Sequence, residues 1–371
     1  MTLKRLFFTA GLLGIVLGLP RTSHAGAGDA ATSTETADES SQKDALPWAG
    51  TTLLFNQNMS TQTAGLDRSQ QTYIGDYQWW LVFSPRYKLN DNFSVSGRID
   101  YSKEFTNSSP TKYAREDQIG DTWLNAMYSE RLKFISPETR GSVGIRLVLP
   151  TSKVSRARGD YLSIGPSVGL SHSFKLRAED KPFSRLGLSW NAIYSHPFAN
   201  SKTAYNRSFT RVRQDTNGQS VDDHTLSGVM MSNHNVMTAF RVDVQIIPKL
   251  TLSPMMAVMW AFKHSPPDAT VNTLTGPVDV ARSPDATTLV TRTWFLTDLT
   301  YDLFDELSLG IGYYNLQNTL APDGKQRTPF GKYNYWWSPD ARLSFDVTFN
   351  LDKIYERFRD LARPKNAAAS L

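Results

Sequence analysis

The sequence predicts an all-β protein: a transmembrane, antiparallel, up-and-down β-barrel of about 12 strands, with a short C-terminal amphipathic helix. Three observations predict this fold. About a dozen stretches alternate apolar and polar residues with a period of two, as a strand with one apolar face does. Short turns and long loops alternate between these stretches. Aromatic residues gather near both ends of the stretches, where a bilayer would have its two surfaces.

The composition agrees with a barrel and excludes other classes. Hydrophobic residues make up 40% of the chain and the mean hydropathy is −0.38, which argues against a helical membrane protein. A barrel is compatible with this value, because half of each strand is polar. The chain has no cysteine, which excludes disulfides and thiolate sites for metals or redox chemistry. A formal net charge of +5 on 371 residues gives no reason to expect a nucleic-acid partner.

The chain begins with an export signal. Two basic residues precede an apolar run, residues 6–19, that is short for a membrane anchor, and Ala25 closes a stretch of small residues that suits signal peptidase. The residues after Ala25 include almost no large apolar side chain and cannot bury enough surface to fold. The expected units are a signal peptide (1–25), a disordered periplasmic tail (26–47), the barrel (48–351), and a C-terminal amphipathic helix with its tail (352–371).

The first six strands follow one another with turn signals between them. In the third, Val95 and Ile99 lie on one face and Arg98 on the other. Residues 90–92, Asn-Asp-Asn, form a tight turn before it, because Asn and Asp tolerate left-handed backbone conformations. The expected strands of this half are 51–59, 76–89, 93–105, 119–134, 141–149 and 161–174.

The last six strands continue the pattern. A long polar segment, 197–235, separates the first two of them, and Pro248 and Lys249 form the shortest turn. The final strand is the clearest, because Leu343 and Phe345 begin an alternation that runs to its end. The expected strands of this half are 184–195, 236–247, 250–262, 289–303, 306–315 and 341–351.

The lengths of the connections decide between two all-β folds. The turns after the even-numbered strands have roughly two to nine residues, and most loops after the odd-numbered strands have about ten to nearly forty. A soluble β-sandwich, the alternative, has no reason to alternate in this way. Outer-membrane barrels do, with both chain ends on the periplasmic side. We therefore expect a protein of the Gram-negative cell outer membrane whose partners are the lipid and the barrel assembly machinery.

The residues after the last strand have helical spacing. Ile354, Phe358 and Leu361 recur at intervals of three or four residues, with charged residues between them. Three placements are open: a solvated helix that covers the last turn of the barrel, a plug folded into the barrel, or a helix on the surface of the inner leaflet.

No catalytic or metal-binding constellation stands out. His172 and Ser173 are adjacent on a strand, so their side chains lie on opposite faces and cannot form the His–Ser pair of an outer-membrane lipid hydrolase. His196 is expected at a strand end and His234 in the long polar loop. We therefore expect no enzyme, no catalytic residue, no metal and no cofactor.

The polar faces of the strands carry charged residues. A charged side chain at the middle of the lipid face costs about 2–4 kcal/mol, so these faces are expected to line the lumen. Arginine outnumbers aspartate on them, which favours a pore for anionic or carboxylated solutes. The alternative is a ladder of Arg–Asp pairs that only braces the wall. The expected lumen-lining residues are Arg86, Arg98, Asp100, Arg131, Arg146, Arg241, Asp243, Arg292, Asp298, Arg342 and Asp346.

One part of the chain resembles a known family. Residues 120–124 (Gly-Asp-Thr-Trp-Leu) open a strand, residues 149–152 (Leu-Pro-Thr-Ser) end the next one, and a Gly/Ser-rich strand follows at 162–174. Together these are similar to the proteobacterial outer-membrane family assigned to the MetA pathway of phenol degradation, although Ser152 stands where that family has Gly. The resemblance covers residues 119–174. It implies a barrel that passes small organic molecules, and it implies no catalytic residue.

The sequence thus favours a passive channel for small solutes, including anionic or aromatic ones. The alternative is a non-transporting surface barrel whose long external loops, above all 197–235, bind a partner or stiffen the envelope. Both functions need the same wall, so the alternation of residues leaves the choice open.

Overall fold

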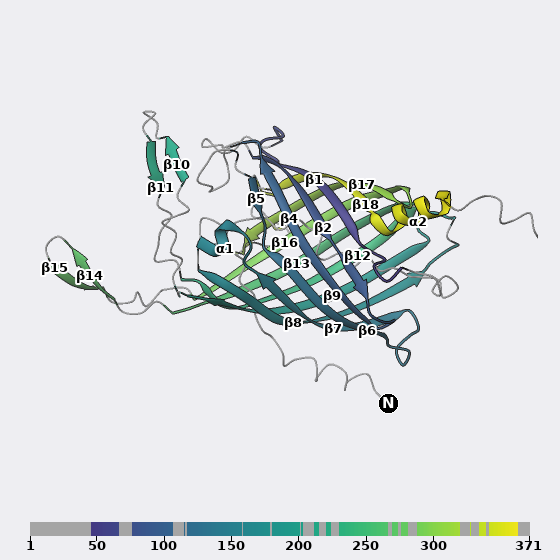
Figure 1. Ribbon diagram of the computed structural model, residues 1–371, viewed down its shortest axis with the longest axis horizontal. Helices are drawn as coiled ribbons and strands as arrows, with labels where there is room; N and C mark the ends of the chain where they lie inside the picture. Colours follow the sequence, from purple (N-terminus) through teal and green to yellow (C-terminus); the bar gives the residue numbers. More distant parts are fainter. Residues whose placement is uncertain are drawn as a thin grey trace, which may run out of the picture.

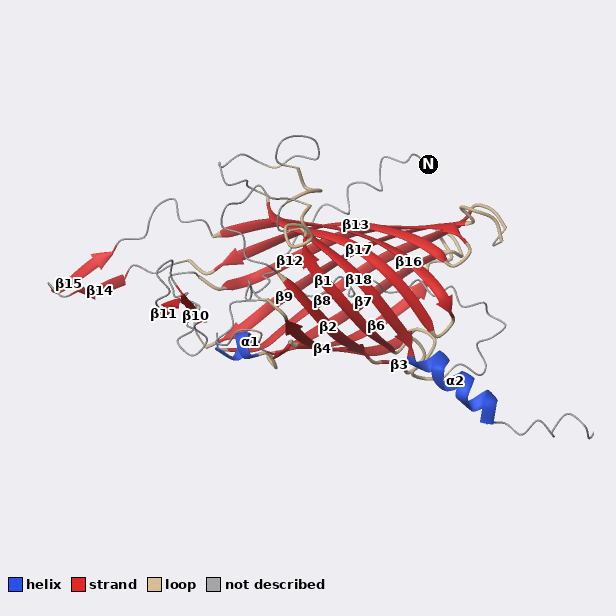
Figure 2. Cartoon of the chain, turned by 90° about the horizontal axis from the view of Figure 1, so that it is seen from above, coloured by secondary structure: helices blue, strands red, loops and turns tan. Residues whose placement is uncertain are grey.

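The computed structural model is a closed β-barrel, with long connections at one end and a helix at the other (Figures 1 and 2). The expected signal peptide, nearly all of the expected periplasmic tail and the last nine residues lie outside the described part of the chain. The structure describes residues 46–66, 76–106, 115, 117–157, 159–178, 180–200, 202, 211–214, 220–223, 230–265, 269–273, 276–280, 288–319, 327, 334–338 and 341–362.

Twelve long antiparallel strands of the described residues form the wall, which confirms the expected fold class. Each strand runs beside the next one in the chain, so the barrel is an up-and-down one. The wall strands are β1 (Thr52–Ser60), β2 (Tyr77–Ser84), β4 (Phe93–Glu104), β6 (Thr122–Arg131), β7 (Thr139–Leu149), β8 (Asp160–Lys175), β9 (Arg185–Ala199), β12 (Ser232–Ile247), β13 (Leu250–Lys263), β16 (Leu289–Phe304), β17 (Leu307–Asn318) and β18 (Arg342–Asn350).

Short elements complete the wall and the connections. β3 (Arg86–Lys88) continues β2 beyond Pro85, which has no N–H to donate to a ladder, and β5 (Asp117–Ile119) precedes β6. The remaining elements are the hairpins β10 (Arg211–Gln214) with β11 (Ser220–Asp223) and β14 (Ala269–Thr273) with β15 (Gly276–Val280), and the helices α1 (Lys153–Ala157) and α2 (Leu351–Ala362). Neither helix in the described part of the chain is long and apolar enough to cross a membrane.

Pairing of the first strand with the last closes the barrel. Thr52 lies opposite Asn350 and Ser60 opposite Arg342, while the other side of β1 pairs with β2. Every wall strand therefore has a neighbour on both sides, which removes the open edges that a sheet would expose. The same pairing brings the start of β1 and the end of β18 to the end of the barrel that holds the short turns, and the long loops leave from the opposite end.

Large apolar side chains cover the outside of the wall. Val143, Phe240 and Ile311 lie within strands, and 54%, 49% and 63% of their surface is exposed. Their chain neighbours turn inward: Ala239, next to Phe240, is 3% exposed. An apolar band of this extent is stable against lipid and unfavourable in water. The barrel therefore spans a bilayer, which places the protein in an outer membrane.

Residues 334–338, in the connection between β17 and β18, lie against the outside of the barrel. Asn315 and Gln317 lie on the outward face of β17, yet they are only 1% and 7% exposed. Each side-chain amide donates to the backbone carbonyl of Tyr335, at 3.0 Å and 3.2 Å. The ring of Trp336 meets that of Phe295 edge-on, with 4.6 Å between centroids. The polar outward end of β17 is thus shielded from lipid by the chain's own backbone.

Candidate functional site: the barrel lumen

The register places the charged residues expected in the lumen on the inward face of the wall. On β4, for example, Arg98 and Asp100 alternate with the exposed side chains of Val95 and Ile99. The role of these residues in selectivity stays a prediction. By strand they are Arg86 (β3), Arg98 and Asp100 (β4), Arg131 (β6), Arg146 (β7), Arg241 and Asp243 (β12), Arg292 and Asp298 (β16), and Arg342 and Asp346 (β18).

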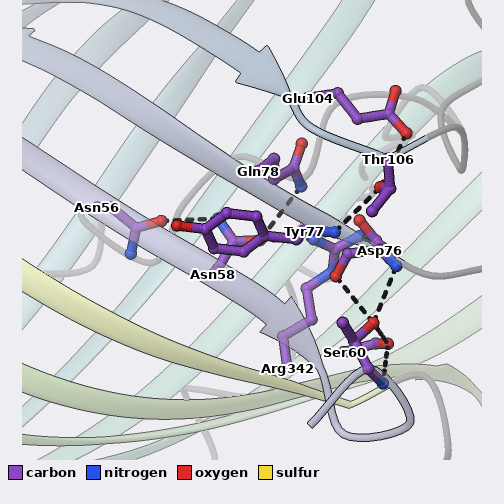
Figure 3. A network of polar contacts seen from close by, with 10 residues as sticks. Asn56, Asn58, Ser60, Asp76, Tyr77, Gln78, Glu104, Thr106 and Arg342 are labelled. Atoms are coloured by element: carbon purple, nitrogen blue, oxygen red, sulfur yellow. Dashed lines mark hydrogen bonds and ion pairs between the residues drawn. The ribbon is translucent and has the colours of Figure 1, made fainter. Parts of the chain in front are cut away.

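A connected polar network joins β1, β2 and β18 near the loop end (Figure 3). Arg342 donates to the side-chain oxygen of Asn58 at 2.5 Å and forms an ion pair with Asp76. Asn58 also accepts from Gln78 at 3.2 Å and donates to Asn56 at 2.7 Å. The side chains of Arg342 and Asp76 are only 6% and 15% exposed. Because its charges are paired and buried, this network braces the wall.

Two carboxylates on the inward face lie over glycines of the neighbouring strand. Asp298 is directly opposite Gly312, and Asp346 is opposite Gly310. A Cβ atom on Gly312 would lie 2.5 Å from Oδ1 of Asp298, and one on Gly310 would lie 3.1 Å from Cβ of Asp346. Because glycine has no Cβ atom, Gly310 and Gly312 leave space for these acidic side chains along the wall.

A tryptophan and two arginines mark the wall formed by β4, β6 and β7. The guanidinium carbons of Arg98 on β4 and Arg146 on β7 lie 5.4 Å and 4.8 Å from the ring centre of Trp123 on β6. Both distances are within the range of a cation–π interaction. Arg98 pairs with Asp100 at 2.6 Å, whereas Arg146 donates to the neutral side chain of Asn125 at 2.7 Å. This wall therefore presents positive charge beside a flat aromatic ring.

The two halves of the lumen differ in charge. The inward faces of β2 to β9 hold eight basic and three acidic residues, whereas those of β12 to β18 and β1 hold four of each, within the described strands. The first half has Arg86, Lys88, Arg98, Arg131, Arg140, Arg146, Lys175 and Arg185 with Asp100, Glu104 and Asp160. The second has Arg241, Lys263, Arg292 and Arg342 with Asp243, Asp298, Asp302 and Asp346. In the ring order, β4, β6 and β7 lie across the lumen from β13, β16 and β17.

Comparisons with known proteins find similar folds only. No protein-family model matches the chain, and no curated protein matches it. An outer membrane channel from Pseudomonas putida F1 is 11% identical, over 83% of this chain and 98% of that one, with a TM-score of 0.46. The KdgM porin is 8% identical over 80% and 98%, with a TM-score of 0.37. The Pseudomonas putida toluene transporter TodX is 11% identical over 81% and 89%, with a TM-score of 0.30.

Identities and TM-scores at this level give no information about the solutes of this chain. The structure is a β-barrel, as the motifs of residues 119–174 imply. The resemblance to the phenol-degradation family itself still rests on those short motifs.

An apolar strip on the inward face is a feature that the alternation did not predict. Met255, Leu296 and Tyr314 are 2%, 0% and 6% exposed, and they are direct cross-strand neighbours. Arg241 lies opposite Met255 at one end of the strip, and Arg342 lies opposite Tyr314 at the other. The strands here are apolar on both faces, so the sequence shows no alternation of apolar and polar residues at these positions. These side chains pack together as a buried apolar cluster, so they fill part of the barrel interior between the two arginines and leave almost no apolar surface open to the lumen.

His234 lies on a strand rather than in the expected loop, because β12 begins four residues before the apolar alternation does. His234 and His196 are outward neighbours near the loop end, with 5.1 Å between ring centres. Nδ1 of His196 is 2.7 Å from the carbonyl of Asn233, and the hydroxyl of Tyr194 is 2.9 Å from Nδ1 of His234. Burial, and then nearby positive charge, holds the pKa of His264 below its ordinary value. Among the described residues, no three His, Cys, Asp or Glu side chains are grouped to hold a metal ion.

Proposed function

We propose that the protein is a passive outer-membrane channel for small solutes that carry negative charge, with a preference for those that have an aromatic or apolar body. The unequal charge of the two lumen halves carries this proposal, because a basic wall raises the local concentration of anions. A barrel of twelve strands lies between small barrels, which their own side chains fill, and wide porins. A narrow and selective path fits that size.

The wall around Trp123 offers contacts for such a solute. A carboxylate near Arg146 would accept hydrogen bonds from the guanidinium, which also donates to the side-chain oxygen of Asn125 in the structure. An aromatic or apolar body would find the indole ring of Trp123 beside that guanidinium. The two kinds of contact together favour a solute with a carboxylate and an aromatic or apolar body. Each contact alone is weak enough for the solute to leave the lumen again.

Measurements on single channels in planar lipid bilayers test the proposal. In a salt gradient, the parent should pass anions in preference to cations. Arg146→Gln should shift the reversal potential toward cations more than Arg241→Gln does, because Arg146 lies in the half of the lumen where basic residues are in excess, and Arg241 lies in the half where the two signs balance. Benzoate should reduce the chloride current of the parent, and Trp123→Ala should weaken this block. A parent that prefers cations would contradict the proposal.

A non-transporting barrel is the second candidate, and the network around Arg342 favours it, because that network satisfies its own charges. On this alternative the parent should show no conductance, even when it migrates faster on a gel unheated than boiled. Loss of either partner, Arg342 or Asp76, should then affect stability alone.

A further inference from the structure

Helix α2 lies outside the barrel, against the rim that holds the short turns (Figures 1 and 2). Arg357 donates to the carboxylate of Glu306, in the turn between β16 and β17, at 3.0 Å. The rings of Tyr355 and Trp48 meet edge-on, with 5.4 Å between centroids. Of the three placements that the sequence left open, the plug is therefore not the one that the structure adopts.

Much of the apolar face of α2 is exposed within the described part of the chain. Tyr355, Phe358 and Leu361 are 48%, 67% and 75% exposed, so exposure increases away from the barrel. On the polar face, Lys353 pairs with Glu356 of the same helix at 3.1 Å. Ion pairs within the helix and with the barrel rim engage charges of α2, whereas its apolar side chains are exposed, so the helix fits an apolar partner better than a charged one.

A groove of about 250 Å³ lies between α2 and the barrel wall. Phe304, Leu307 and Phe349 line it from the wall, and Ile354 and Phe358 line it from the helix. Leu307 and Phe349 are direct neighbours on the outward face of β17 and β18. Since that face contacts lipid along the rest of its length, the groove continues the lipid-facing surface of the barrel.

We propose that α2 is a lipid-docking element that lies in the headgroup region of the inner leaflet of the outer membrane. Phe358 and Leu361 enter the acyl-chain boundary, and an acyl chain of a phospholipid occupies the groove. The continuity of the helix face with the lipid band identifies this partner. Amphipathic helices of this kind bind bilayer surfaces through their buried apolar area. The proposal is independent of whether the barrel conducts.

The chain has no cysteine, so single-cysteine variants can be labelled at one site each. We would compare spin labels at Leu361→Cys and Asp360→Cys in the full-length barrel, reconstituted in vesicles of phosphatidylethanolamine and phosphatidylglycerol. These neighbouring positions lie on the apolar and the polar side of α2. The label at 361 should be severalfold more accessible to oxygen, which dissolves in acyl chains, than to a water-soluble nickel chelate. The label at 360 should show the reverse.

Two results would overturn the proposal. A label at 361 that the chelate reaches as easily as the label at 360 would mean that the helix is solvated. A label at 361 that neither reagent reaches would mean that protein covers it, as a second copy of the chain would. Phe358→Asp supplies a further check: it should raise chelate access at 361 severalfold and leave the heat-modifiable migration of the barrel unchanged.

Discussion

Loss of the Arg342 guanidinium should destabilise the barrel by about 3 kcal/mol. Arg342 is 5% exposed, and its ion-pair partner Asp76 has a side chain that is 15% exposed. Arg342→Gln would leave the Asp76 carboxylate charged without its partner and would remove a donor to Asn58. Breaking a buried ion pair from one side costs about 3–5 kcal/mol. We expect the lower end, because the aspartate keeps some contact with water.

A double-mutant cycle with Arg342→Gln and Asp76→Asn measures this energy. Guanidinium unfolding in lipid vesicles, followed by tryptophan fluorescence, gives the free energy of each variant. The double variant should cost about 1–2 kcal/mol less than the sum of the two single ones. Arg357→Gln is the control. The side chain of Arg357 is exposed, so loss of its ion pair with Glu306 should leave the unfolding midpoint unchanged. Additive effects, or a cost below about 1 kcal/mol for Arg342→Gln, would refute the reasoning.

The lipid face, the inward glycines and the contact of α2 should each respond to one substitution and not to its control. Val168→Arg, on the lipid face, should cost about 2–4 kcal/mol and reduce the heat-modifiable band, whereas Ser167→Arg, on the inward face, should assemble. Gly312→Ala should cost about 1–3 kcal/mol in the same unfolding assay, because the new Cβ would lie 2.3 Å from the hydroxyl of Ser344. In the control Gly187→Ala, the new Cβ would lie 3.4 Å from its nearest neighbour, so the free energy of unfolding should change little. A backbone hydrogen bond, and then the cation on α2, holds the pKa of Glu306 below its ordinary value, so the contact persists above that pKa and is lost as the pH falls through it. A spin label on α2 should therefore become mobile only in strong acid, and Glu306→Gln should remove this pH dependence.

Strands with one apolar and one polar face were predictable from the sequence. On β18, Leu343 and Phe345 alternate with polar residues, and the observed strand, Arg342–Asn350, lies within the expected 341–351. The lumen charges were predictable for the same reason, because lipid excludes them from the other face. The alternation of short turns and long loops predicts the orientation of the barrel without any tertiary information, and that orientation stays a prediction.

Features that depend on tertiary partners were not predictable. The loop expected over 197–235 is shorter, because β9 runs to Ala199, where its end pairs with β8, and β12 begins at Ser232, where its start pairs with β13. Gln317 breaks the apolar pattern of β17, and its side-chain NH₂ group donates to the backbone carbonyl of Tyr335 in the connection that follows this strand. Trp123 was noted only as part of a motif. Its role as the partner of two cations appears when three strands are brought together.

The pairing of β1 with β18 also constrains how the barrel forms. Thr52 and Asn350 are almost 300 residues apart, so the ladder that closes the barrel joins strands from opposite ends of the barrel sequence. Contacts of such long range make folding slow, because loop closure must precede any gain from the contact. Until the ends meet, an incomplete sheet exposes two unpaired edges that can pair with other chains. The rate of closure, rather than the stability of the finished barrel, therefore sets how long the nascent chain needs protection from aggregation.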